Sequence, residues 1–168
     1  MVVDEGAGTG TLAIALAHAR SDIAVIGLNG DADVRALAQR KTGSRRVDWR
    51  PGLADELPLP DASADRVVMS LLLHHLAPDA KQCRAARGSS RPAAGGRLHI
   101  ADWGRPGDPL MRMAFLVLQL IDGFAGTRDH AAGRLPGFLT DAGLTGVTAH
   151  ARLRTIWGHL ELLSATRP

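Results

Sequence analysis

The chain of 168 residues has few of the features that mark several protein classes. Its single cysteine, Cys83, excludes an internal disulfide and leaves no cysteine cluster that could hold a metal. We therefore expect no metal site. No apolar run reaches the ~18 residues that a membrane-spanning helix needs. The N-terminus lacks the basic segment that opens a signal peptide. We therefore expect a cytosolic protein without a membrane partner.

Lysine is also scarce, because Lys41 and Lys81 are the only two and arginine supplies the rest of the basic side chains. The net charge is +3, but the basic residues are scattered and form no dense run. No aromatic motif of the RNA-binding kind is present. These observations predict that nucleic acid is not a partner.

Glycine is abundant by contrast, and its most informative stretch lies near the N-terminus. Two valines lead into Asp4, and glycines follow at alternate positions, Gly6, Gly8 and Gly10, before a helix-forming run over residues 12–19. This pattern predicts a strand, a tight loop and the start of a helix. Because glycine has no Cβ and tolerates positive φ, a ligand can approach the backbone of such a loop closely.

Two common nucleotide motifs do not fit the glycine spacing. A dinucleotide-binding loop needs a glycine at position 11, where this chain has Thr11, so a nicotinamide-dependent oxidoreductase is disfavoured. A phosphate-binding loop needs a lysine that is absent here. A glycine-rich turn that binds no ligand stays open as an alternative.

Strand-like and helix-like segments alternate along the chain, which predicts one α/β domain over residues 1–168. We expect a mostly parallel sheet with helices on both faces and an antiparallel pair at the C-terminus. The expected strands are 2–4, 23–28, 47–50, 65–70, 97–102, 147–153 and 155–166. The expected helices are 12–19, 31–41, 78–87, 109–124 and 133–142.

Polar side chains recur where the expected strands end. They are Asp4, Asn29, Asp55, Ser70 and Asp102. Ligands of open parallel sheets bind at the carboxyl ends of the strands, beside the point where the strand order reverses. The sequence therefore predicts a binding site at this edge.

In this order the motifs resemble class I S-adenosylmethionine-dependent methyltransferases, in the small-molecule branch similar to ubiquinone/menaquinone methyltransferases. The matching segments are residues 4–10, 54–55 ahead of 57–61, 65–68, 74–76, and 92 with 95–98. The resemblance implies a Rossmann-like sandwich with a seven-stranded sheet. It also suggests an N-terminally truncated member that lacks the usual cap helices.

The resemblance further implies S-adenosylmethionine as cofactor, whose sulfonium and ammonium suit an acidic residue ahead of the loop. The residues that it implies for cofactor binding are Asp4, Gly6, Gly8, Gly10, Asn29, Ala54, Asp55, Ser70 and Leu71. Asn29 stands where the family has a carboxylate for the ribose. Because charge-assisted hydrogen bonds are roughly twice as strong as neutral ones, this departure predicts weaker hydrogen bonds to the ribose hydroxyls of the cofactor.

Candidates for catalysis are fewer, since methyl transfer depends mainly on proximity and alignment. His74 and His75 follow the fourth expected strand, where a histidine could act as general base or form part of the pocket wall. Asp102 ends the fifth strand and could contact the acceptor or merely cap the strand. Asp129 and His130 could face the pocket, but we expect them to form a solvated loop pair.

The segment 110–121 is apolar nearly all round, so it must be buried as core, as a substrate lid or in a dimer. We favour a lid-plus-core role and a small lipophilic or aromatic methyl acceptor, and a homodimer is possible. The alternative is a non-catalytic binding module that keeps the methyltransferase fold.

Overall fold

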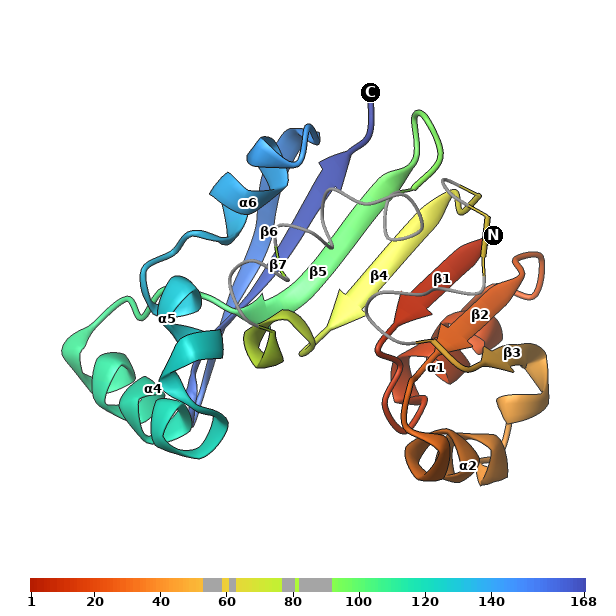
Figure 1. Ribbon diagram of the computed structural model, residues 1–168, viewed down its shortest axis with the longest axis horizontal. Coiled ribbons are helices and arrows are strands. Elements are labelled where there is room, and N and C mark those ends of the chain that lie inside the picture. Colours follow the sequence, from red (N-terminus) through yellow and green to blue (C-terminus); the bar gives the residue numbers. More distant parts are fainter. Residues whose placement is uncertain (53–58, 61–62, 77–80, 82–91) are drawn as a thin grey trace.

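The computed structural model describes residues 1–52, 59–60, 63–76, 81 and 92–168. Ala54, Asp55, Cys83 and most of the helix expected over 78–87 lie outside the described residues. The described elements, labelled as in Figure 1, are β1 (Val2–Glu5), α1 (Thr11–Ala19), β2 (Val25–Leu28), α2 (Ala32–Arg40), η1 (Ser44–Arg46), β3 (Val47–Arg50), β4 (Arg66–Ser70), η2 (Leu73–His75), β5 (Arg97–Trp103), α4 (Pro109–Asp122), α5 (Phe124–Ala131), α6 (Leu135–Asp141), β6 (Thr145–Thr155) and β7 (Gly158–Thr166).

Seven strands form one sheet in the order β3-β2-β1-β4-β5-β7-β6 (Figure 1). The strands from β3 to β5 pair in parallel, whereas β7 is antiparallel to both β5 and β6. The predicted mostly parallel seven-stranded sheet with an antiparallel C-terminal strand is thereby confirmed. The chain leaves β1 toward β2 and β3 and then returns to β4 on the other side of β1. This reversal opens a crevice at the carboxyl ends of β1 and β4.

Register divides the buried side chains between two faces of the sheet, because successive residues of a strand point to opposite sides. Val3, Ile26, Val67 and Leu98 lie in one paired row and share a core cluster with Leu135, Phe138 and Leu139 of α6. On the other face, Val25 and Val47 pack against Ala13 and Ala17 of α1. Helices therefore cover both faces, as predicted.

The C-terminal half differs from the expected boundaries. The helix expected over 109–124 ends at Asp122, because Gly123 has a φ angle of 89° that breaks it, and α5 follows as a separate helix. Asp129 and His130, expected in a solvated loop, lie in α5 and are only 4% and 0% exposed. That expectation was wrong, since the segment between α4 and α6 forms a helix that packs against η2.

Helix α4 is only half buried. Its inner side packs Met111, Phe115 and Leu118 toward the sheet, whereas several large apolar side chains on its outer side are exposed. The expected core role is confirmed for the inner side alone. No helix in the described part of the chain is long and apolar enough to cross a membrane.

Candidate functional site

The loop between β1 and α1 depends on three glycines with positive φ angles, 68° at Gly6, 53° at Gly8 and 82° at Gly10. A Cβ on Gly10 would lie 2.4 Å from the indole ring of Trp49, so packing also demands glycine there. A Cβ on Gly8 would meet only the Gly6 carbonyl oxygen, at 3.9 Å. The backbone at Gly8 is therefore the place where a ligand can approach most closely.

A pocket of about 510 Å³ opens beside this loop, at the carboxyl ends of β1 and β4. Five of the residues expected to bind a cofactor line it: Asp4, Gly6, Gly8, Ser70 and Leu71. The rest of the lining consists of Ala7, Thr9, Thr11, Leu12 and Ala15. The structure thus brings residues from β1, α1 and the end of β4 to one cavity.

Asp4 is the buried charge of this pocket. The residue is only 1% exposed, and neither carboxylate oxygen has a hydrogen-bond partner among the described residues. Burial raises the pKa of Asp4 to about 7, because desolvation, together with the smaller effect of the Glu5 charge, outweighs the favourable effect of the nearby Ala13 backbone amide. A buried carboxylate without a partner is costly, so this side chain is suited to a cationic ligand.

Asn29 does not line the pocket, and its side chain is already engaged. Its Oδ1 accepts a hydrogen bond from the backbone N–H of Asp31 at 2.9 Å, and its Nδ2 donates to the Gly8 carbonyl at 3.4 Å. The carboxylate of Asp31 caps α2 by accepting from the backbone of Asp33 and Val34. Asn29 therefore ties the glycine loop to the turn after β2, which its sequence position alone does not reveal.

Leu71, on the far wall of the pocket, has a φ angle of 50°, an uncommon value for a residue with a side chain. Its backbone N–H donates to the Ala101 carbonyl at 2.8 Å, which ties the turn after β4 to β5. Leu71 is exposed at the mouth of the pocket, as is Leu12. The pocket therefore has an apolar rim beside a charged interior.

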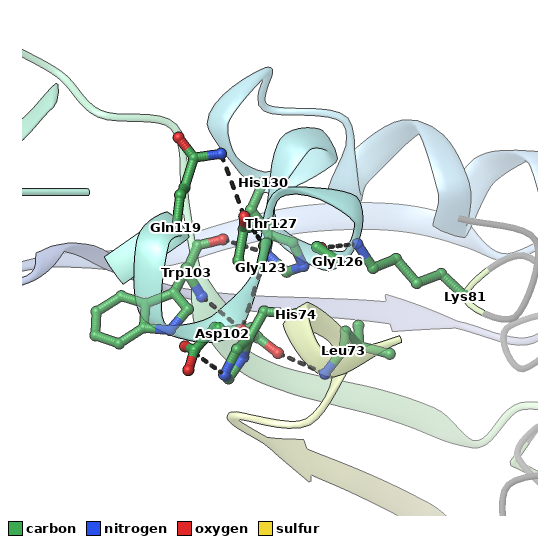
Figure 2. A network of polar contacts seen from close by, with 11 residues as sticks. Leu73, His74, Lys81, Asp102, Trp103, Gln119, Gly123, Gly126, Thr127 and His130 are labelled. Carbon is green, nitrogen blue, oxygen red and sulfur yellow. Dashed lines mark hydrogen bonds and ion pairs between the residues drawn. The ribbon is translucent and has the colours of Figure 1, made fainter. Parts of the chain in front are cut away.

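Three residues beyond Leu71, His74 meets Asp102 in a buried pair that Figure 2 shows. The His74 Nδ1 lies 2.8 Å from Asp102 Oδ1, and the Asp102 carboxylate also accepts the backbone N–H groups of Leu73 and Trp103. Because the carboxylate accepts, Nδ1 carries the proton and Nε2 is the basic nitrogen. Burial alone would raise the pKa of Asp102, but these hydrogen bonds and the nearby histidine charges hold it below its ordinary value.

His75, the second candidate histidine, contacts His74 with ring centroids 4.0 Å apart and ring planes tilted by 43°. Burial lowers the pKa of His75, and the charge of His74 lowers it further. Asp122 at the end of α4 lies 3.7 Å from His74 Nε2. Of the two histidines, His74 alone pairs closely with a carboxylate within the described residues.

A second buried layer behind this pair consists of residues that the sequence analysis did not assign to a site. His130 donates from Nδ1 to the Trp103 carbonyl at 2.6 Å, and its Nε2 has no hydrogen-bond partner in the described part of the chain. Lys81 donates to the Gly126 carbonyl (Figure 2). Its Nζ also lies 3.7 Å from Asp129 Oδ2. Desolvation lowers the pKa of both Lys81 and His130. No local motif marks these residues, since they come together only through the packing of α5.

Metal ligation has no support in the described ranges, where no group of three or more histidine, cysteine, aspartate or glutamate side chains is arranged to hold an ion. The two features of this edge are therefore a glycine-lined pocket with a buried acid and an adjoining histidine–aspartate pair.

Comparison with known proteins bears on the first of these features. A family model described as a methyltransferase domain matches residues 3–94, which carry the glycine loop, β4 and His74. The chain belongs to this methyltransferase domain family.

Two curated proteins resemble this methyltransferase-family chain over part of their length. One is the ubiquinone/menaquinone biosynthesis C-methyltransferase UbiE of Rubrivivax gelatinosus, 38% identical over 69 residues, or 41% of this chain and 26% of that protein. The other is an uncharacterized methyltransferase of Anoxybacillus flavithermus, 31% identical over 102 residues, or 61% of this chain and 46% of that protein. The matches thus span less than half of either relative.

Among solved structures, the magnesium protoporphyrin IX methyltransferase of Synechocystis, crystallised with bound SAH, is 23% identical to the chain with a TM-score of 0.71. The match covers 100% of this chain and 74% of that one. At this level of identity the likeness establishes the Rossmann-like methyltransferase fold.

Proposed function

We propose that the chain binds S-adenosylmethionine in the glycine-loop pocket and transfers its methyl group to a small lipophilic or aromatic acceptor. The observation that carries the proposal is the buried, unpartnered Asp4 carboxylate beside the open backbone of Gly8. The ammonium group of the cofactor can pair with this carboxylate, and the methionine portion can lie close to the Gly8 backbone. Family membership supports the same reading.

Residues of the pocket would each contact a different part of the cofactor. Asp4 would bind the ammonium group, the glycine loop would approach the methionine portion, and Ser70 and Leu71 would line the opposite wall. When bound, this cofactor supplies an electrophilic methyl group on its sulfonium. The roles of Gly10, Asn29, Ala54 and Asp55 stay predictions, as do the cytosolic location and a homodimer.

His74 would act on the acceptor. With its Nδ1 proton held by Asp102, the Nε2 nitrogen can take the proton that an acceptor hydroxyl loses as its oxygen gains the methyl group. Asp102 would orient the ring and stabilise the imidazolium that forms. The turn over residues 70–74 connects the pocket wall to this base directly in sequence, and the apolar rim at Leu12 and Leu71 supports an apolar acceptor.

The test is calorimetric titration of the folded 168-residue chain with S-adenosylmethionine, S-adenosylhomocysteine and NAD. We expect micromolar binding of the first two and none of NAD, followed by S-adenosylhomocysteine release in a screen of hydroxylated aromatic compounds. A folded chain that binds none of them would overturn the proposal and leave the non-catalytic alternative. Binding of NAD alone would point to an oxidoreductase.

A further inference from the structure

The outer side of α4 presents large aliphatic side chains to solvent. Leu120 is 69% and Ile121 67% exposed. With their neighbours they form a stripe opposite the buried side of the helix, which we call the α4 ridge: Leu110, Met113, Leu116, Val117, Leu120 and Ile121. A helix that is apolar on its outer side is unusual in a soluble domain and marks an interaction surface.

Arginines lie along one flank of the α4 ridge, toward α5. Two adjoining hollows of about 570 and 520 Å³ share Arg112, and Arg105 lines the first while Arg128 lines the second. The second hollow also contains Leu116 and Phe124, so cationic and apolar groups meet in one groove. None of the three arginines takes part in an ion pair with another described residue.

The carboxylates near this flank are either paired or turned away from solvent. Asp108 caps α4 through the Met111 N–H and pairs with Arg154 at 3.0 Å. Asp122 turns inward to His74, and Asp129 is buried beside Lys81. In the part of the chain that the structure describes, the α4 ridge and its flank therefore carry three arginines without an ion-pair partner, whereas the nearby carboxylates are paired or turned away from solvent. A partner must bring the negative charge itself.

We propose that the α4 ridge and its arginine flank dock on the surface of an anionic phospholipid bilayer. The aliphatic side chains enter the boundary between headgroups and acyl chains, and Arg105, Arg112 and Arg128 contact lipid phosphates from the groove. Helices that lie in a membrane interface combine an apolar face with flanking arginine or lysine in this way. Surface docking needs no spanning helix, so it is compatible with the absence of one among the described residues.

Charge favours a bilayer over a second copy of the chain. Two copies joined through the α4 ridge would bring arginines together without offering them a carboxylate that is both exposed and unpaired on this surface. Protein interfaces also carry about one hydrogen bond per 100–200 Å², whereas the six side chains of the α4 ridge have no hydrogen-bonding group. A lipid surface supplies both the apolar layer and the phosphates.

The experiment is co-sedimentation of the full chain with vesicles of neutral phosphatidylcholine and with vesicles that also contain phosphatidylglycerol. We expect partition onto the anionic vesicles alone, decreasing as salt rises. A double variant, Arg112→Gln with Arg128→Gln, should lose about fivefold per arginine. A second variant, Leu120→Ser with Ile121→Ser, should lose about tenfold or more, since it removes inserted apolar surface.

The matched control is Leu37→Ser with Arg45→Gln, which changes an exposed leucine and an exposed arginine on α2 and η1. It should partition like the unchanged chain, and thermal unfolding should show that all variants remain folded. Equal partition onto neutral vesicles, or no partition at all, would overturn the proposal. So would sedimentation velocity that shows a dimer lost only in the Leu120/Ile121 variant, together with no vesicle binding. The readout needs no cofactor, so it stands apart from the test of the methyltransferase function.

Discussion

The buried side chain of Asp4 lowers the stability of the free chain but favours the binding of a cationic ligand. Its carboxylate is buried at the base of the glycine-loop pocket, and its pKa of about 7 lies well above the 3.8 of a solvated aspartate. As pH rises from about 4 to 7, Asp4 is ionised in the unfolded chain but still protonated in the folded one, so the stability of the free chain falls. A cationic ligand that pairs with the carboxylate recovers part of this cost, which makes the binding of such a ligand dependent on pH.

We predict that S-adenosylmethionine binds more tightly as pH rises from 5.5 to 7, by up to about tenfold per pH unit, and releases a proton. Calorimetry in buffers of different ionisation enthalpy measures both effects. Asp4→Asn should abolish the proton release and weaken binding, yet stabilise the free chain at pH 8, by at most roughly 4 kcal/mol. Binding that does not change with pH would show that Asp4 does not meet the cation.

Asn29 gives a second prediction at this scale. Replacing it by aspartate keeps an acceptor for the Asp31 N–H, removes the donor to Gly8 and adds a charge for ribose hydroxyls. A charge-assisted hydrogen bond exceeds a neutral one by about 1 kcal/mol, so Asn29→Asp should tighten S-adenosylmethionine binding about fivefold. Asn29→Ala is the control and should weaken it. Weaker binding by the aspartate variant would mean that the tie to Gly8 matters more than the charge.

His74 is the third residue whose role can be tested. His74→Gln should lower kcat about 10²–10⁴-fold, the usual contribution of a general base, and leave the cofactor Kd within about twofold. Asp102→Asn should lower kcat as well, because a neutral amide no longer stabilises the imidazolium that forms when His74 takes the proton. His150→Gln changes an exposed histidine on β6 and should have no effect. Equal loss of cofactor binding and turnover in His74→Gln would indicate a structural role.

At the scale of elements, α5 and η2 are in direct backbone contact. A Cβ on Gly126 of α5 would lie 2.0 Å from the His74 carbonyl oxygen, a distance that no rotamer change can relieve. The close approach of these two elements places His130 and Lys81 behind the His74–Asp102 pair. This contact could not be predicted from the sequence, because a glycine inside a helix reads the same whether it touches another backbone or faces solvent.

Two glycine-to-alanine changes test this difference. Gly126→Ala should destabilise the chain by more than about 2 kcal/mol, since overpacking against backbone forces α5 and η2 apart. Gly137→Ala lies in α6 with nothing within 4 Å of the new Cβ, and it should stabilise by about 0.5–1 kcal/mol. Urea unfolding measures both. Similar effects of the two changes would refute the close approach of α5 to η2.

Across the whole molecule, burial of several histidines couples stability to pH. Desolvation lowers the pKa values of His75, His99 and His130. The unfolded chain therefore binds protons at these sites at a higher pH than the folded chain does. The free energy of unfolding consequently falls as pH drops below about 6.5. The raised pKa of Asp4 acts in the opposite sense over the same range.

We predict that the urea midpoint of Asp4→Asn falls more steeply between pH 7.5 and 5 than that of the unchanged chain. Adding His130→Asn, which keeps a donor for the Trp103 carbonyl, should make the fall shallower again. The measurement is the urea midpoint as a function of pH for the unchanged chain, for Asp4→Asn and for the double variant. Identical slopes in all three would show that neither side chain changes its proton affinity on folding.

The order of elements could be read from the chain because local signals repeat along it. Apolar runs marked the strands, the glycine loop marked the start of α1, and the alternation of strands and helices led to the parallel sheet that the structure has. Polar residues after strands also predicted the right edge, since parallel strands bring their carboxyl ends together. These features depend on spacing within a few residues, which a single sequence displays directly.

Contacts between distant segments were decided by tertiary packing. The pairing of His74 with Asp102, the burial of His130 and Lys81 under α5, and the use of Asn29 as a tie to Gly8 each join residues far apart in the chain. The outer side of α4, which the sequence predicted to be buried as core, as a lid or in a dimer, is likewise exposed in the folded chain. Burial and pKa depend on what packs around a side chain, and that neighbourhood exists only once the chain has folded.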